Sequence, residues 1–111
     1  MRIFLANAPW SKPGYYGVRA GSRWPHFEKK GCPYLPFPFF LAYTAALLRD
    51  NGYPVQLIDA IAEGIDEEMF FTRMQEFNPN LILFECSTAS FKTDLKILER
   101  TRELFGTKVQ I

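Results

Sequence analysis

The sequence predicts an α/β protein in which helices cover both faces of a parallel sheet, a three-layer, doubly wound fold. Apolar runs of strand length alternate with longer segments in which apolar residues recur at helical spacing. The resulting order is β-α-β-α-β-α-β, which favours parallel strand pairing with helical crossovers. Residues that start or stop helices, mainly proline, aspartate, asparagine and glycine, stand at the expected boundaries.

Four segments have strand character. Residues 2–6 and 53–59 hold apolar and β-branched residues, and residues 81–86 form a nearly continuous apolar run, which is typical of a strand covered on both faces. Residues 108–111 open a fourth strand. Because the backbone groups of half a strand need partners, we expect residues 1–111 to be a single domain that forms the N-terminal fragment of a longer chain.

Three helices are predicted between these strands. Pro36 and Pro38 mark the start of the first helix, and Asn51-Gly52 marks its end, with Gly52 in the left-handed cap position. Asp66 is the expected N-cap of the second helix. That helix stops at 78–79, and the third runs from the turn at 87–90 to the glycine at 106. The expected apolar stripes are Leu41, Ala45 and Leu48 flanked by Phe40, Thr44 and Leu47; then Phe70, Met74 and Phe77; then Phe91, Leu95 and Leu98.

Composition excludes several classes of protein. The formal net charge is +1 and no basic stripe is visible, so duplex nucleic acid is not an expected partner. No apolar run has transmembrane length, and the N-terminus lacks the pattern of a signal peptide. Two cysteines make no disulfide framework, so a cytoplasmic location is expected. Cys86, in an apolar run, is expected to be an inert core thiol, and Cys32 to be more exposed.

A long segment without helical or strand periodicity follows the first strand, from residue 7 to about residue 36. It is rich in glycine, proline and aromatic residues and holds two arginines and the single histidine, His26. Open parallel sheets bind ligands beyond the carboxyl ends of their strands, and in a flavodoxin-like order the first and third strands flank that point. The segment and the turn at 87–90 are therefore the candidate site. Its composition suits a large planar or amphipathic ligand, although the aromatics could instead cover the sheet edge or a further domain.

Five stretches carry a resemblance to a known family. They are LANAP (5–9), YGVRAGSRWP (16–25), PFPFFLAY (36–43), LIDA (57–60) and STASF (87–91), and the first two are the most specific. Together they resemble the N-terminal cobalamin-binding domain of cobalamin-dependent radical SAM enzymes, and the likeness covers nearly the whole chain.

The resemblance implies a flavodoxin-like domain that holds cobalamin against a downstream barrel of the same chain. That barrel would carry a 4Fe-4S cluster and S-adenosylmethionine and would perform methylations or cyclisations. Carried over by position, the residues facing the corrin ring are Asn7, Ala8 and Pro9, and those approaching the nucleotide tail are Ser87, Thr88 and Ser90. The sequence departs from related patterns because the histidine motif that ligates cobalt and the three-cysteine cluster motif are both absent. We therefore expect no metal ligand, no catalytic residue and no reaction by this fragment alone.

Other interpretations of the same residues stay open. Ser87 or Ser90 could simply cap the third helix, and Asp59 is expected to be a turn or cap residue rather than a ligand contact. Arg19 and Arg23 could bind a phosphate or pair with Glu28 and Trp24. For the whole chain, the alternatives are an interaction or structural domain that docks on a catalytic domain, and a flavin or nucleotide domain of the same topology.

Overall fold

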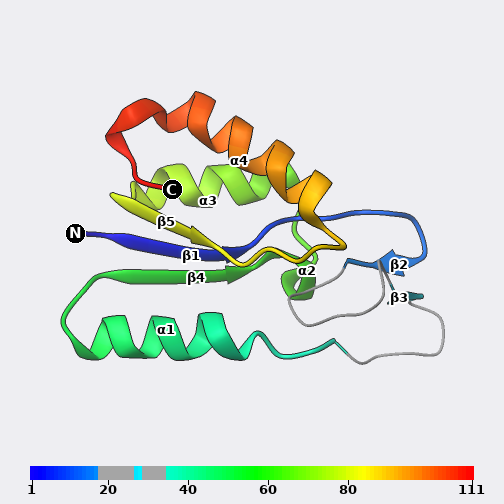
Figure 1. The fold of residues 1–111 in the computed structure, drawn as a ribbon, viewed down its shortest axis with the longest axis horizontal. Coiled ribbons are helices and arrows are strands. Elements are labelled where there is room, and N and C mark those ends of the chain that lie inside the picture. Colours follow the sequence, from blue (N-terminus) through cyan, green and yellow to red (C-terminus); the bar gives the residue numbers. More distant parts are fainter. Residues whose placement is uncertain (18–26, 29–34) are drawn as a thin grey trace.

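The computed structural model describes residues 1–17, 27–28 and 35–111. Its central sheet holds three parallel strands, β1 (Ile3–Asn7), β4 (Val55–Asp59) and β5 (Leu81–Phe84), in the order β4-β1-β5 (Figure 1). β1 thus lies in the centre, and the chain reaches β4 on one side and β5 on the other. This order confirms the predicted α/β, flavodoxin-like topology and puts the switch point between β1 and β5.

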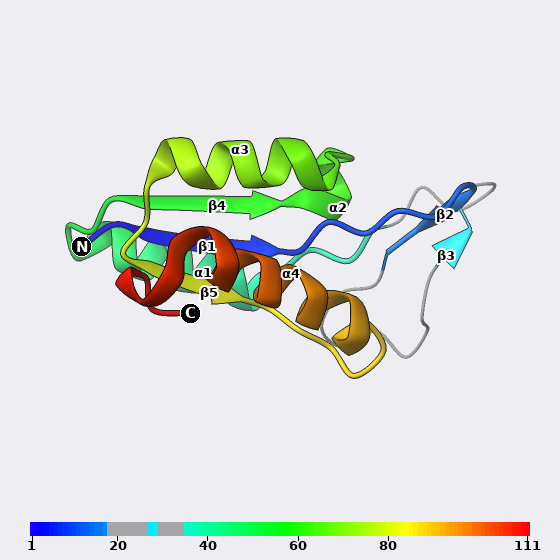
Figure 2. The ribbon, with the colours of Figure 1, turned by 90° about the horizontal axis from the view of Figure 1, so that it is seen from above.

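Helices lie on both faces of this sheet. α1 (Phe39–Asp50) lies on one side, and α3 (Glu67–Phe77) and α4 (Phe91–Phe105) lie on the other (Figures 1 and 2). A helix of one turn, α2 (Ala60–Glu63), follows β4 directly and was not predicted. No helix of the described ranges is long and apolar enough to cross a membrane.

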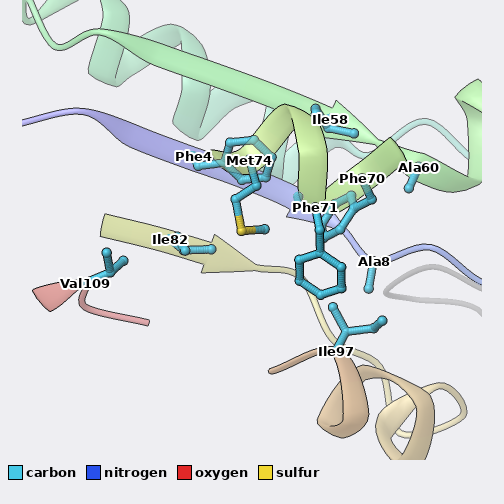
Figure 3. Packing of buried hydrophobic residues seen from close by; sticks show 11 residues of the cluster. Phe4, Ala8, Ile58, Ala60, Phe70, Phe71, Met74, Ile82, Ile97 and Val109 are labelled. Carbon is cyan, nitrogen blue, oxygen red and sulfur yellow. The ribbon is translucent and has the colours of Figure 1, made fainter. Parts of the chain in front are cut away.

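The larger of the two hydrophobic clusters fills the space between the sheet and helices α3 and α4 (Figure 3). Phe4 of β1 is fully buried there, and its ring meets that of Phe70 edge-on, with 6.0 Å between centroids. Met74 and Ile82 are also fully buried. Phe70 and Met74 face the core as predicted, and Phe77 packs at its border, so the second helical stripe is confirmed.

Among the described residues, α1 is the helix that covers the opposite face of the sheet. Leu41 is buried against Ile3 and Leu5, and Ala45 and Leu48 pack beside it, so the predicted stripe of this helix is confirmed. Its predicted flanks are not, because Phe40 and Leu47 are exposed. α1 packs on β4 and β1. The neighbouring β5 keeps its residues on this face only half-buried, so the expectation of a strand covered on both faces is wrong for residues 81–86.

The predicted helix boundaries agree with the structure. Asp66 is the N-cap of α3, and its Oδ1 accepts a hydrogen bond from the Met69 amide at 2.8 Å. Gly52 has a φ of +83° after α1, and Gly106 has a φ of +60° after α4. Glycine suits these positions because it has no Cβ to clash in the left-handed region.

The predicted stripe of α4 is wrong. Phe91 and Leu95 are exposed, and the buried residues of this helix are instead Asp94, Ile97 and Thr101. Thr101 can be buried because its hydroxyl donates to the carbonyl oxygen of Ile97 at 2.6 Å. The hydrophobic pattern alone therefore predicts the wrong face of α4, because Asp94 and Thr101 are buried with hydrogen-bond partners in or next to their own helix.

The remaining segments differ from the prediction in detail. Residues 106–108 form a 3₁₀ turn, η1 (Gly106–Lys108), and the expected fourth strand is reduced to a parallel bridge between Gln110 and Leu81. Two short strands were not predicted: β2 (Tyr15–Tyr16) and β3 (Phe27–Glu28) pair antiparallel within the long segment.

Candidate functional site

The described parts of the long segment lie where the sequence predicted a ligand site. β2 and β3, together with α2, lie beyond the carboxyl ends of the sheet strands (Figure 1). The aromatic-rich segment therefore extends from the same end of the sheet at which open parallel sheets bind their ligands.

A pocket of about 550 Å³ lies between this segment and α2. Its volume is in the range of about 300–1,000 Å³ that is usual for small-molecule sites. Trp10, Tyr15 and Tyr16 line one side, and residues 60–62 and 64–66 line the other. The segment lies close to α2 at Gly17, where an added Cβ atom would stand 3.1 Å from Cδ1 of Ile61 in α2 and 2.9 Å from the Cβ atom of Trp10. The pocket wall thus depends on a glycine at this position.

Asn7, at the end of β1, is the predicted site residue with the most informative environment. Its side chain is only 2% exposed, and its Nδ2 finds no hydrogen-bond acceptor within the described part of the chain. Since Ile3 and Leu5 face α1 and strand side chains alternate, Asn7 faces the α1 side as well. A buried amide donor without an acceptor costs about 1–3 kcal/mol, so its presence needs an explanation.

Two acidic residues lie beside Asn7 at the carboxyl ends of the neighbouring strands. Asp59 is its register partner on β4, and the Glu85 amide extends the ladder on the other side by donating to the Ala6 carbonyl oxygen at 3.0 Å. Alternation along the strands places all three side chains on the α1 side. Asp59 also caps α2, because its Oδ1 accepts from the Ala62 amide at 3.2 Å. The predicted cap role of Asp59 is therefore confirmed.

Ala8 and Pro9 turn away from Asn7. Ala8 is buried in the core between the sheet and helices α3 and α4. Pro9 lines a separate pocket of about 240 Å³ near the N-termini of α3 and α4, which Asp66 and Lys96 also border. The three consecutive residues that the resemblance assigns to one ring thus occupy three different environments.

The predicted tail residues belong to a hydrogen-bonded cluster at the start of α4. The hydroxyl oxygens of Ser87 and Ser90 are 2.8 Å apart, and the Ser90 hydroxyl donates to Asp94 Oδ2 at 2.5 Å. Ser90 is the N-cap residue by position, but its side chain makes no capping bond to the helix. The expected capping by a serine hydroxyl is therefore absent at Ser90, while Thr88 is exposed.

Asp94 is the residue of this cluster that sequence reasoning missed. Burial raises the pKa of its carboxyl group, and hydrogen bonds from the Ser90 hydroxyl, the Ser87 backbone and the Cys86 thiol oppose that rise. The signal that could have revealed it is the spacing Ser90-x-x-x-Asp94, which puts both side chains on one face of a helix.

The structure corrects the prediction for Cys86. Its side chain is exposed just after β5 rather than buried in the core, because the strand ends at Phe84. Partial burial raises the pKa of the thiol, and the nearby Asp94 and Glu85 carboxylates raise it further. The thiol is therefore held in its protonated, weakly nucleophilic form.

Several residues singled out in the sequence lie outside the described residues: Arg19, Arg23, Trp24, His26 and Cys32. Within the described ranges, no group of three histidine, cysteine or acidic side chains is placed to hold a metal ion. The sequence matches no protein-family model, no curated protein and no solved structure.

Proposed function

We propose that this chain is the cobalamin-binding module of a radical SAM iron–sulfur enzyme of the methyltransferase or cyclase type, and that it is not catalytic by itself. The proposal is supported by the sequence resemblance, by the flavodoxin-like strand order and by the pocket beyond the carboxyl ends of the strands. The observation that carries it is the buried Asn7 amide at the switch point of the sheet.

The chemistry of Asn7 fits this ligand. A corrin ring is a broad planar group whose rim carries amide side chains, and an amide carbonyl is a good acceptor for the Asn7 Nδ2. A ligand that supplies this acceptor removes the cost of a buried donor, which makes the amide selective for a polar rim. Asn7 would therefore orient the ring rather than ligate the cobalt.

The aromatic residues supply the second part of the fit. Trp10, Tyr15 and Tyr16 offer flat faces at the pocket wall, and such faces pack against a planar ring and exclude water from it. When bound, cobalamin supplies the cobalt centre for methyl transfer or radical chemistry. The 4Fe-4S cluster, S-adenosylmethionine and the substrate would belong to the downstream barrel.

The assignment of Ser87, Thr88 and Ser90 to the nucleotide tail follows from the resemblance. Two features of the cluster are compatible with it. Thr88 is exposed, and the Asp94 carboxylate already accepts a hydrogen bond from the Ser90 hydroxyl within the turn, at 2.5 Å. The tail would contact Thr88 directly, while Ser87 and Ser90 hold the turn in shape.

Cobalamin binding is the decisive experiment. Hydroxocobalamin is titrated into the 111-residue chain and into a longer version that extends past Ile111, with the corrin absorption spectrum and tryptophan fluorescence as readouts. We expect binding by the longer protein, with a Kd at least about tenfold weaker for Asn7→Leu, because one buried hydrogen bond is lost. Asn80→Leu is the matched control, since Asn80 precedes β5 at the opposite end of the sheet.

Three outcomes would contradict the proposal. The longer protein could fail to bind cobalamin at all. It could bind flavin and be yellow when purified, which would indicate a flavin domain of the same topology. Alternatively, Asn7→Leu could bind cobalamin as tightly as the wild type, in which case the site assignment is wrong.

A further inference from the structure

The outer surface of α1 is apolar, although it faces away from the sheet. We define the α1 outer patch as the side chains of Phe37, which precedes the helix, and of Phe39, Phe40, Tyr43 and Leu47 in α1. Their exposed fractions are 60%, 58%, 78%, 71% and 64%, respectively. The Phe37 and Phe39 rings meet edge-on at 5.1 Å, and the Phe39 and Tyr43 rings stack at 6.3 Å. Phe40 and Leu47 lie three and four residues from Tyr43, a spacing that makes them its neighbours on the helix surface, so the patch is continuous.

The other helices do not have such a surface. α3 and α4 carry charges on their outer sides, where Arg73 pairs with Glu63 at 2.5 Å and Arg100 pairs with Glu67. In α1, by contrast, no charged residue occurs before Arg49. Its inner side is also apolar, because Leu41 and Leu48 face the sheet. A helix that is apolar on both sides is normally buried on both sides.

We propose that the α1 outer patch pairs with the same patch on a second copy of this chain, forming a two-fold symmetric dimer. The area is sufficient: partly exposed aromatic and leucine side chains contribute about 100–150 Å² each, or about 600 Å² per subunit. Two such patches, when fully covered, bury up to about 1,200 Å², which reaches the lower bound of a specific interface. This inference does not depend on cobalamin binding and can fail or succeed separately.

The chemistry of the patch favours a second copy over other partners. Residues 39–48 carry no charge, so they offer nothing to select a partner of opposite charge. A lipid surface is disfavoured because helices that lie on membranes are rich in lysine and arginine on their polar side, and α1 has only Arg49. A self-complementary apolar surface needs only a two-fold axis.

Antiparallel packing of the two helices makes a specific prediction of contacts. With the two-fold axis between Tyr43 and Thr44, Phe40 packs against Leu47 of the partner subunit. These two positions are seven residues apart, or two helical turns, and therefore lie on the same side of α1. Thr44, which is half-buried, lies next to its own equivalent across the axis.

The test is the molecular mass of the 111-residue chain in solution, measured by sedimentation equilibrium at up to about 100 µM, which detects a Kd in the micromolar range. We expect twice the chain mass of 12.9 kDa. Phe40→Glu and Leu47→Glu should each weaken the dimer at least about tenfold, because each buries a charge at the centre of the interface.

Matched controls are available on α4. Phe91→Glu repeats the first substitution in the first turn of a helix, and Leu104→Glu repeats the second near a helix end; both residues are exposed. Neither control should change the dimer. Circular dichroism should show the same helix content for all four variants, since every site is on the surface.

A cross-link tests the packing direction. In a background of Cys32→Ser and Cys86→Ser, oxidation should join two copies through Thr44→Cys but not through Asp50→Cys. The proposal is overturned if the wild type is a monomer at the highest concentration. It is also overturned if the dimer tolerates both α1 substitutions, if the controls disrupt it equally, or if the chain associates with neutral phosphatidylcholine vesicles instead of with itself.

Discussion

Replacing Asn7 with leucine should stabilise the ligand-free chain and weaken its ligand complex. Asn7 is almost fully buried at the end of β1, with a side-chain amide that no acceptor of the described residues satisfies. Leucine has a similar volume and no polar atoms, so the substitution removes the unpaired donor without leaving a cavity. The higher stability of the ligand-free chain and the weaker ligand binding have the same cause, the removal of the amide donor.

The magnitudes follow from the burial of Asn7. An unsatisfied buried donor costs about 1–3 kcal/mol. Because leucine packs less well than asparagine in this position, the free energy of unfolding should rise by about 1–2 kcal/mol in Asn7→Leu. For a domain of this size the midpoint of thermal unfolding should rise by roughly 4 °C or more. With cobalamin at about 100 times its Kd, the wild type gains about 2.7 kcal/mol by mass action, whereas Asn7→Leu gains much less.

Urea unfolding with and without cobalamin measures both effects. Asn80→Leu is the control, because Asn80 Oδ1 accepts a hydrogen bond from the Arg2 amide at 2.7 Å and should therefore lose stability on the same substitution, by about 0.5–1.5 kcal/mol. If Asn7→Leu destabilises the ligand-free chain as much as Asn80→Leu does, the Asn7 amide has an acceptor of its own, and the reasoning is refuted.

Three further predictions concern residues near the site. Because burial raises the pKa of Asp94, the folded chain binds the proton of this carboxyl group more tightly than the unfolded chain does. The protonated Asp94 therefore adds to the free energy of unfolding in acid, and this contribution is lost as the pH rises through the raised pKa. Asp94→Asn should flatten this pH dependence of the free energy of unfolding, measured by urea unfolding at several pH values. Peptide-resolved alkylation should modify Cys86 more slowly than a free cysteine at neutral pH, and Asp94→Asn should speed it, since the carboxylate helps to raise the thiol pKa; an unchanged rate would contradict the assigned contact. Gly17→Ala should lower the free energy of unfolding by about 1–3 kcal/mol, because its methyl group would overlap Trp10; a neutral effect would show that the segment can shift.

The three sheet strands and most helix ends could be predicted from the sequence because they depend on local chemistry. Asp66 caps a helix and Gly52 ends one for reasons that operate within a single turn. The exposed outer side of α1 was not predicted, because a broad apolar stripe does not reveal which part of it meets the sheet. Only the packed structure shows that Leu41 is inside and Phe40 outside.

The position of the aromatic segment was predictable, and the polar contacts near it were not. Topology and unusual loop composition both indicated the carboxyl ends of the strands, where the described aromatic residues do lie. The polar contacts depend on the face to which each side chain points, and neighbouring residues at a strand end point to opposite faces. Asn7 and Ala8 therefore lie on opposite faces of the sheet. Asp94 belongs to the serine cluster although its position in the sequence resembles that of an ordinary helix residue.

Because Asn7 and Ala8 lie on opposite faces of the sheet, a planar ligand can meet only one of them at a time. A ring seated on the α1 side meets Asn7. Asp59, at the end of β4, and Glu85, directly after β5, lie on either side of Asn7. A ring seated on the opposite side would meet the apolar cluster around Ala8, which packs against α3 and α4. The α1 side is also bordered by a pocket of about 380 Å³ that holds Asp59 and Pro38. The Asn7 amide and the two carboxylates that could recognise an amide-rimmed ligand thus lie on the α1 side, so the polar rim of the ring is expected to contact that side of the strand ends.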